Sequence, residues 1–396
     1  MIILTKKLQK FLIVLIIIST TFPSISYGAI SNVDKFSKSS ILIDQDTGRV
    51  LYEKNPDEKR PLASLSKMMT FLLAIEAINN KEVNKKDIIV VDKDIAKVRG
   101  SSYHLKVGEK VPLIELMKGL MIVSGNDAAV AISKHIAKSE DEFVKRMNKK
   151  AKEIGMNNTS FVNCNGLPIY SLADPKKPPK ENISTARDIA TLGKYMMDNY
   201  EKEVTSITDM QTYTYEKRGF CKNNTNGLLS IIPEVDGIKT GYTGNAGYCL
   251  AFSMKINEDT KNVENRLIGV SLGANHKNKR IQACLNMLKY GRENFTTQKV
   301  MSKEDLIGKK YLMGLDELEI TLESNDDLII VKKNDENINT QITFKEMKIP
   351  IKKGEVLGVI KYYNDEGEIL GSNNIVSRHD LCDISTKTRI KMIFGN

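Results

Sequence analysis

Apolar residues in this chain follow a helical spacing in some stretches and a strand-like alternation in others. From Leu65 to Ile78 they recur every three to four residues, which predicts a helix. The same spacing predicts helices over residues 113–123, 127–137 and 277–293. Strands are predicted over residues 234–238, 246–256 and 266–272, the last two as a hairpin across the charged loop 257–265. The chain should therefore open with a hairpin, pass through a helical region and return to strands.

The pattern changes near residue 298 to short alternating runs punctuated by glycines. Strands are predicted there over residues 318–322, 329–331, 342–344 and 356–362. They indicate a small β-sandwich without catalytic residues. Because the chain is too long for one ordinary core, we expect two domains and two terminal segments. The expected boundaries are a signal peptide over 1–28, a catalytic domain over 29–296, a C-terminal β-rich domain over 297–380 and a tail over 381–396.

The first residues have the parts of a secretory signal. A lysine-rich start precedes an apolar run from Phe11 to Ile18, and the small residues Ser26 and Gly28 predict a cleavage site before Ala29. The apolar run is far shorter than the ~20 residues of a membrane-spanning helix. We therefore expect an exported protein, located in the cell wall or on the outer face of the cytoplasmic membrane.

Composition narrows the possible partners. The formal net charge of +10, about +7 without the three lysines of the signal region, is compatible with attraction to anionic wall polymers or lipid headgroups. A merely soluble surface explains the charge almost as well. No basic run is interleaved with aromatic residues, so we expect no nucleic-acid partner. Five cysteines, an odd number at scattered spacings, predict free thiols rather than a disulfide framework.

One Ser-x-x-Lys motif, Ser64-Leu65-Ser66-Lys67, lies at the start of the first predicted helix. The helix dipole and unpaired N–H groups of the first turn favour a serine alkoxide and the oxyanion that it creates. Lys67 follows one turn later on the same face, within reach of the Ser64 hydroxyl. Lysine acts as a base only when burial or a nearby cation, such as Lys239, lowers its pKa. Alone, the motif also fits a helix cap with a solvated lysine.

Two further short motifs follow in order. Ser124-Gly125-Asn126 lies in a predicted turn between two helices, where a hydroxyl can relay a proton and an amide can bind a peptide group. Taken alone, this motif also fits a plain turn. Ser372-Asn373-Asn374 has the same pattern and is expected to be a surface turn.

The third motif, Lys239-Thr240-Gly241, ends a predicted strand. Its cation and hydroxyl could hold a carboxylate, and Gly241 has no side chain to block a peptide that adds to the strand edge. The backbone N–H of Tyr242 could join that of Ser64 as an oxyanion hole. Alone, the motif also fits a lysine and a threonine on a solvated strand end.

Several kinds of site are not predicted. None of the four histidines lies next to a candidate nucleophile, so a Ser-His-Asp triad or a histidine-rich zinc site is not expected. The chain has no phosphate-binding or dinucleotide-binding glycine motif. We therefore expect neither a cofactor nor a metal.

From about Ile41 to Asp380, these motifs and their surroundings resemble the serine-type D-alanyl-D-alanine carboxypeptidases, the low-molecular-mass penicillin-binding proteins. The resemblance implies an α+β catalytic domain like that of β-lactamases and transpeptidases, in which an antiparallel sheet meets a helical subdomain at the catalytic cleft. It also implies a C-terminal β-sandwich, a terminal segment that can lie on the membrane, and peptidoglycan stem peptides and β-lactam antibiotics as ligands.

The resemblance also implies residue roles. Ser64 would be acylated by the penultimate D-alanine, with Lys67 as general base and Ser124 as proton relay. Asn126 would contact the substrate, and Lys239 and Thr240 would hold its carboxylate. An arginine that assists them in some relatives would fall within residues 273–280.

More than one activity is compatible with the sequence. A class A β-lactamase would use a Glu-x-x-Leu-Asn segment, which is absent here, and would lack the C-terminal domain. An endopeptidase that cuts wall cross-links and a catalytically idle penicillin-sensing or wall-binding protein would both be compatible with the motifs. The tail 381–396 mixes apolar and basic residues without a clean apolar face, so it gives only a weak case for peripheral membrane contact.

Overall fold

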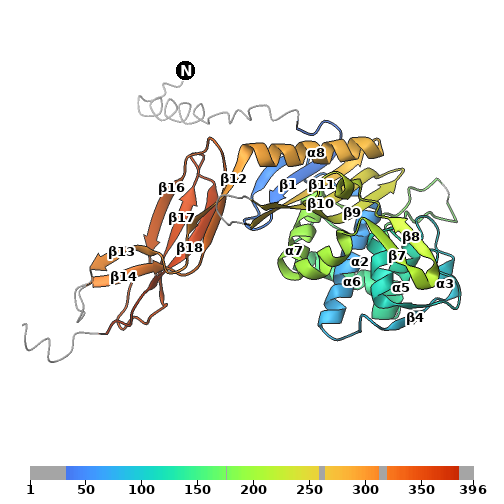
Figure 1. Cartoon of the computed structure of the whole chain (residues 1–396), viewed down its shortest axis with the longest axis horizontal. Coiled ribbons are helices and arrows are strands. Elements are labelled where there is room, and N and C mark those ends of the chain that lie inside the picture. Colours follow the sequence, from blue (N-terminus) through green and yellow to red (C-terminus); the bar gives the residue numbers. More distant parts are fainter. Residues whose placement is uncertain (1–32, 175, 258–263, 312–318, 383–396) are drawn as a thin grey trace, which may run out of the picture.

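The computed structural model describes residues 33–174, 176–257, 264–311 and 319–382. Figure 1 shows two bodies joined near β12, with the larger one formed by the first part of the chain. The predicted signal peptide and most of the predicted tail lie outside the described residues. Within these ranges, no helix is long and apolar enough to cross a membrane.

The larger body is built around an antiparallel five-stranded sheet in the order β2-β1-β11-β10-β9. The strands are β1 (Ser39–Asp44), β2 (Val50–Lys54), β9 (Val235–Thr243), β10 (Gly247–Asn257) and β11 (Glu264–Ala274). Alternate residues of β1 point to opposite faces. Ile41 and Ile43 pack into the core on the side of α7, whereas Leu42 packs toward α8. The sheet is therefore covered on both faces, and β9 is left as an edge strand (Figure 1).

Helices gather beside β9 and form a separate subdomain (Figure 1). The helices are α2 (Lys67–Asn79), α3 (Lys93–Ala96), α4 (Leu113–Met121), α5 (Asn126–Ala137), α6 (Glu140–Glu153) and α7 (Ala186–Thr208), and α8 (Lys277–Asn294) covers the far face of the sheet. Three short strand pairs complete this body: β3 (Arg60–Pro61) with β6 (Ile183–Ser184), β4 (Ile88–Val90) with β5 (Lys110–Pro112), and β7 (Thr212–Tyr215) with β8 (Phe220–Asn223). Most of α2 is buried, because the helix passes through the middle of the subdomain. The predicted mixture of an antiparallel sheet and a helical subdomain is confirmed.

The smaller body contains only strands among its described residues. β12 (Phe295–Met301) pairs with β15 (Leu328–Lys333), and a five-stranded antiparallel sheet has the order β13-β14-β18-β17-β16. The strands of that sheet are β13 (Leu306–Tyr311), β14 (Glu319–Ser324), β16 (Asn339–Phe344), β17 (Val356–Tyr363) and β18 (Ile369–Ser377). The predicted C-terminal β domain is therefore confirmed.

The expected turn at Ser372-Asn373-Asn374 is wrong, because these residues lie inside β18. Asn373 is buried, and its Nδ2 donates to the Asp326 carbonyl oxygen over 2.5 Å. Asparagine is common in turns, and it also forms hydrogen bonds when buried. The residue types alone therefore do not distinguish a surface turn from a buried strand.

The two bodies meet through an ion cluster centred on Arg49, in which Arg49 and Glu336 are buried and Glu368 is half exposed. Its Nη1 donates to Glu336 Oε2 and to the Val331 carbonyl oxygen, both over 2.7 Å. Its Nη2 donates to Glu336 Oε1 over 2.7 Å and to Glu368 Oε2 over 2.9 Å. The side chains of Arg49 and Glu336 are only 7% and 9% exposed. Despite burial, hydrogen bonds from Arg49 and Asn364 lower the pKa of Glu336 to about 2.

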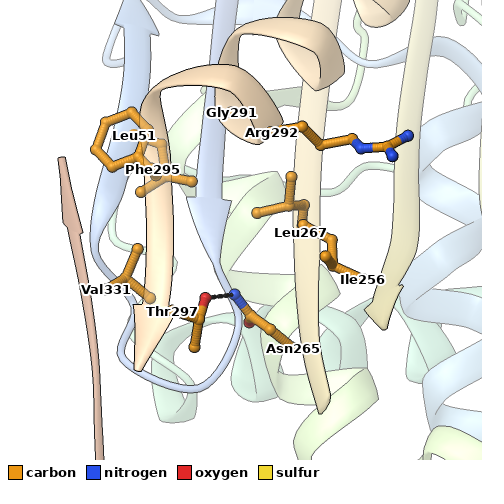
Figure 2. Close-up of a pocket in the computed structure, with 9 residues that line it drawn as sticks. All are labelled: Leu51, Ile256, Asn265, Leu267, Gly291, Arg292, Phe295, Thr297 and Val331. Carbon is orange, nitrogen blue, oxygen red and sulfur yellow. Dashed lines mark hydrogen bonds between the residues drawn. The ribbon is translucent and has the colours of Figure 1, made fainter. Parts of the chain in front are cut away.

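A cavity of about 200 Å³ lies at the same junction (Figure 2). Its apolar wall comes from both bodies and includes Leu51, Leu267 and Val331. The hydrogen bond from Asn265 Nδ2 to Thr297 Oγ1 ties the wall of β11 to that of β12. The junction thus combines apolar packing with paired charges.

Replacing Arg49 with alanine should destabilise the protein by about 3 kcal/mol, because it leaves the buried Glu336 carboxylate without its cation. The measurement is denaturant unfolding at pH 7. Arg146→Ala is the matched control, since the pair between Arg146 and Glu82 is roughly half exposed, and its loss should cost less than about 1 kcal/mol. Equal shifts in the two variants would show that the interdomain cluster adds no stability.

Candidate active site

The predicted nucleophile stands at a bend in the backbone. Ser64 belongs to a 3-10 turn, Ala63–Ser66, and α2 begins directly after it at Lys67. The Lys67 Nζ lies 2.8 Å from Ser64 Oγ, as the spacing of the motif predicts. It also donates to the Asn165 carbonyl oxygen over 2.6 Å. These two contacts fix the amine against the serine hydroxyl.

Lys67 is completely buried. Loss of water lowers its pKa to about 7, because burial disfavours the ammonium form. A large share of the molecules therefore carry a neutral amine at neutral pH, which can accept the proton of Ser64. The sequence analysis named a nearby cation, Lys239, as one possible cause of a lowered Lys67 pKa, whereas the main cause in the structure is burial.

The second motif forms the turn between α4 and α5. Ser124 has a left-handed φ of 63°, and Asn126 is the first residue of α5. Asn126 Nδ2 donates to the Arg99 carbonyl oxygen over 2.8 Å. Ser124 Oγ and Asn126 Oδ1 are both buried, and neither has a hydrogen-bond partner within the described part of the chain. Because a buried polar atom gains from a hydrogen-bond partner, both atoms are available to pair with a ligand.

Asp127 holds this turn in place, although the sequence analysis did not select it. Its carboxylate accepts hydrogen bonds from Ser102 Oγ over 2.7 Å, Tyr103 N over 2.8 Å and Leu105 N over 3.1 Å. These bonds tie the start of α5 to the loop at residues 99–105. In the sequence, Asp127 resembles an ordinary acid in the first turn of a helix, so no local signal marked it.

The third motif lies on the edge strand β9. Lys239 is almost fully buried, and its Nζ donates to the Thr240 carbonyl oxygen over 2.9 Å. Burial holds the pKa of Lys239 well below its usual value, and the charges of Lys67 and Arg280 lower it further. Thr240 Oγ1 donates to Thr225 Oγ1 over 2.8 Å. Two amines and a guanidinium thus lie near one another, where a ligand carboxylate would be stabilised.

Arg280 lies in the first turn of α8 and is 8% exposed. Its Nη1 donates to the Cys249 carbonyl oxygen over 3.3 Å, and its buried Nε has no partner within the described ranges. Arg280 falls within the segment 273–280, where the resemblance implied an arginine. The sequence motifs alone did not identify it.

Two glycines let the backbone close around the nucleophile. A Cβ at Gly241 would lie 3.1 Å from Ser64 N, and one at Gly166 would lie 1.9 Å from the Ala63 carbonyl oxygen. Gly166 also has a φ of +88°, which favours glycine. The space beside Ser64 N–H therefore depends on the lack of side chains at both positions. The side chain of Tyr242 lies outside this space, and its ring stacks on Tyr248 with centroids 4.3 Å apart.

Comparison with known proteins identifies the family of this chain. A family model described as D-alanyl-D-alanine carboxypeptidase matches residues 28–276. The chain belongs to the D-alanyl-D-alanine carboxypeptidase family. A second model, described as penicillin-binding protein 5, C-terminal domain, matches residues 295–381.

Relatives of the D-alanyl-D-alanine carboxypeptidase family match this chain along most of its length. It is 34% identical to the D-alanyl-D-alanine carboxypeptidase DacF of Bacillus subtilis, over 91% of this chain and 90% of that protein. It is 33% identical to DacC of Escherichia coli, over 81% of this chain and 78% of that protein. Penicillin-binding protein 5 of Haemophilus influenzae superimposes with a TM-score of 0.74 at 28% identity, covering 88% of this chain and 98% of that one.

Within the D-alanyl-D-alanine carboxypeptidase fold, the predicted site residues come from three segments of this chain. Ser64 and Lys67 are in direct contact, and Gly241 lies against the backbone of Ser64. Ser124 and Asn126 lie in the turn that begins α5, and Lys239 and Thr240 lie on β9. Among the described residues, no group of three or more His, Cys, Asp or Glu side chains could hold a metal ion.

Proposed function

We propose that this protein removes the terminal D-alanine from peptidoglycan stem peptides that end in D-Ala-D-Ala, through an acyl-enzyme on Ser64. The observation that carries the proposal is the buried Lys67 amine, 2.8 Å from Ser64 Oγ and with a pKa of about 7. Such an amine is a suitable general base at neutral pH, and it needs no histidine.

Binding of the substrate carboxylate is assigned to Lys239 and Thr240, with Arg280 beside them. Burial deprives the Lys239 ammonium of water. The negative charge of a bound carboxylate would stabilise this ammonium and so raise the pKa of Lys239. The substrate backbone then lies along the free edge of β9. Its scissile carbonyl reaches the backbone N–H groups of Ser64 and Tyr242, each worth ~3–4 kcal/mol in the transition state.

The reaction then follows from these contacts. Lys67 takes the proton from Ser64 Oγ, and the oxygen attacks the carbonyl carbon of the penultimate D-alanine. As the tetrahedral intermediate collapses, the C–N bond breaks and the leaving amine receives a proton, relayed from Lys67 through Ser124. Free D-alanine departs, and water hydrolyses the ester on Ser64. A β-lactam would acylate the same serine when its amide bond opens.

The N-terminal and C-terminal segments indicate where in the cell the enzyme acts. The basic and apolar N-terminal run supports export, so the enzyme is proposed to act in the cell wall or on the outer face of the cytoplasmic membrane. Peripheral membrane contact is assigned to the tail 381–396, which carries both apolar and basic residues. Deletion of that tail should lower the membrane-bound fraction, and an unchanged fraction would remove the assignment.

The decisive experiment incubates the purified protein with a muropeptide ending in D-Ala-D-Ala and follows its mass. Loss of one alanine residue is expected from the wild type, and none from Ser64→Ala, because that variant has no nucleophile. Rapid hydrolysis of penicillin without alanine loss would indicate a β-lactamase instead. Covalent trapping of labelled penicillin without turnover of either compound would indicate a sensor.

A further inference from the structure

The hydroxyl of Ser124 is held by a backbone conformation that serine does not favour. Ser124 has a left-handed φ of 63°, and its buried Oγ has no hydrogen-bond partner among the described residues. A left-handed conformation at a residue other than glycine persists only where the surrounding structure holds it. The side chains that pack against this turn therefore determine where the hydroxyl lies.

Tyr103 is the side chain that packs most closely against the turn. It is completely buried, and a Cβ at Gly125 would lie 2.9 Å from Tyr103 Cβ. Its backbone N–H donates to Asp127 Oδ1 over 2.8 Å, and its hydroxyl lies 2.7 Å from that of Tyr213 on β7. A shift of Tyr103 would therefore be felt directly at the second motif.

Arg218 holds Tyr103 in place. It lies in a 3-10 turn, Glu216–Arg218, at the tip of the hairpin that β7 and β8 form beside the helical subdomain (Figure 1). Its guanidinium carbon is 4.2 Å from the centre of the Tyr103 ring. Its Nη1 donates to the Tyr103 carbonyl oxygen over 3.2 Å, and its Nη2 donates to the His104 carbonyl oxygen over 2.9 Å. One side chain thus contacts both the ring and the backbone of the loop at residues 99–105.

The contacts of Arg218 also hold a second left-handed residue. His104 has a φ of 60°, so the carbonyl oxygen that Arg218 Nη2 binds belongs to another residue that depends on its surroundings. The Arg218 side chain is only 11% exposed, and it also binds the Glu109 carboxylate through Nε and Nη2. Hydrogen bonds with an ionised partner are stronger than neutral ones, so the guanidinium fixes the loop firmly.

We propose that Arg218 is a positioning residue for the proton relay, and that it acts on Ser124 through Tyr103. The role assigned to Arg218 rests on the proposed function, in which Ser124 delivers a proton to the leaving amine. Without Arg218, Tyr103 loses these contacts and the turn relaxes toward the right-handed backbone that serine favours. The Ser124 hydroxyl then lies out of reach of the leaving nitrogen. The contact between Ser64 and Lys67 belongs to a different segment of the chain and is kept.

Two substrates with the same acyl group separate the relay from the rest of the site. They are Nα,Nε-diacetyl-L-lysyl-D-Ala-D-Ala and the matching ester, in which D-lactate replaces the terminal D-alanine. The amide nitrogen must gain a proton as its C–N bond breaks, whereas lactate leaves with the electron pair of its C–O bond as a far less basic alkoxide. Both substrates form the same acyl-enzyme, so the ratio of their kcat/KM values compares the acylation step alone.

Arg218→Ala should lower kcat/KM for the amide by about thirtyfold and for the ester by roughly threefold or less, so the amide-to-ester ratio falls about tenfold. Loss of folded enzyme would lower both values equally and leave the ratio unchanged. Arg218→Lys should not restore the ratio, because an ammonium lacks the planar, branched geometry with which Arg218 reaches two carbonyl oxygens and Glu109.

The matched control is Arg187→Ala. Arg187 is 39% exposed and also binds carboxylates, those of Asp57 and Glu53. It lies in the first turn of α7, in a different segment from the loop at residues 99–105. The amide-to-ester ratio of this variant should therefore stay at the wild-type value.

A double-mutant cycle tests whether Arg218 acts through Ser124. Ser124→Ala alone should lower the amide-to-ester ratio, and Arg218→Ala should lower it no further in that background. An unchanged ratio in either single variant, a ratio restored by Arg218→Lys, or additive losses in the double variant would overturn the positioning role. If the wild type releases neither D-alanine nor D-lactate, the proposed function fails, and the positioning role fails with it.

Discussion

Substitution of Lys67 by arginine should reduce the rate of acylation by penicillin by about a thousandfold, although a long basic side chain is kept. Arginine remains protonated at any ordinary pH and cannot accept the proton of Ser64. Loss of a general base typically costs 10²–10⁴ in rate. The rate is measured with labelled penicillin, and denaturant unfolding shows that the variant is folded.

The same amine sets the pH dependence of the wild type. Below its pKa of about 7, Lys67 is protonated and cannot act as a base. The acylation rate should therefore rise roughly tenfold per unit as pH increases toward 7, and level off above it. A rate that stayed constant between about pH 5 and pH 9 in folded protein, or Lys67→Arg with near wild-type acylation, would exclude Lys67 as the base.

Gly166→Ala should be the most damaging single-methyl change near the site. An added Cβ would lie 1.9 Å from the Ala63 carbonyl oxygen, so the backbone that carries Ser64 would have to move. Displacement of a nucleophile by about 1 Å can cost 10²-fold in rate. We expect acylation by penicillin to fall at least about a hundredfold, with a lower midpoint in denaturant unfolding.

The matched control for this prediction is Gly155→Ala. Gly155 has a φ of +86°, close to the +88° of Gly166, but nothing lies within 4 Å of its added Cβ. Both variants should bear the left-handed strain of about 1–2 kcal/mol, and only Gly166→Ala should lose acylation. Similar acylation rates in the two variants would mean that the contact with Ala63 does not position the nucleophile.

Local patterns predicted the parts of this protein that depend on local spacing. The three-residue separation of Ser64 and Lys67 predicted their contact, because residues one helical turn apart share a face. The helix at residues 277–293 was also predicted nearly as it is, since its apolar residues repeat regularly. The strand predicted over residues 234–238, with the motif Lys239-Thr240-Gly241 at its end, continues as β9 through that motif to Thr243.

Long-range contacts account for what the sequence did not predict. The Asn165 carbonyl that binds Lys67 is 98 residues away, and a backbone oxygen leaves no mark in a sequence. Arg280 reaches the cation cluster only because α8 packs on β10. Asp127 acts through a loop that precedes it by more than twenty residues, and so it looked like a routine helix-start acid.

The shared guanidinium of Arg49 has a mechanical consequence. One side chain is held by two carboxylates and a backbone oxygen of the neighbouring β domain, so neither body can swivel without breaking several charge-assisted bonds at once. These bonds therefore hold the strand domain in one orientation relative to the larger body at this junction. If the far end of the β domain is attached to another structure, the catalytic cleft therefore keeps a constant orientation relative to that attachment.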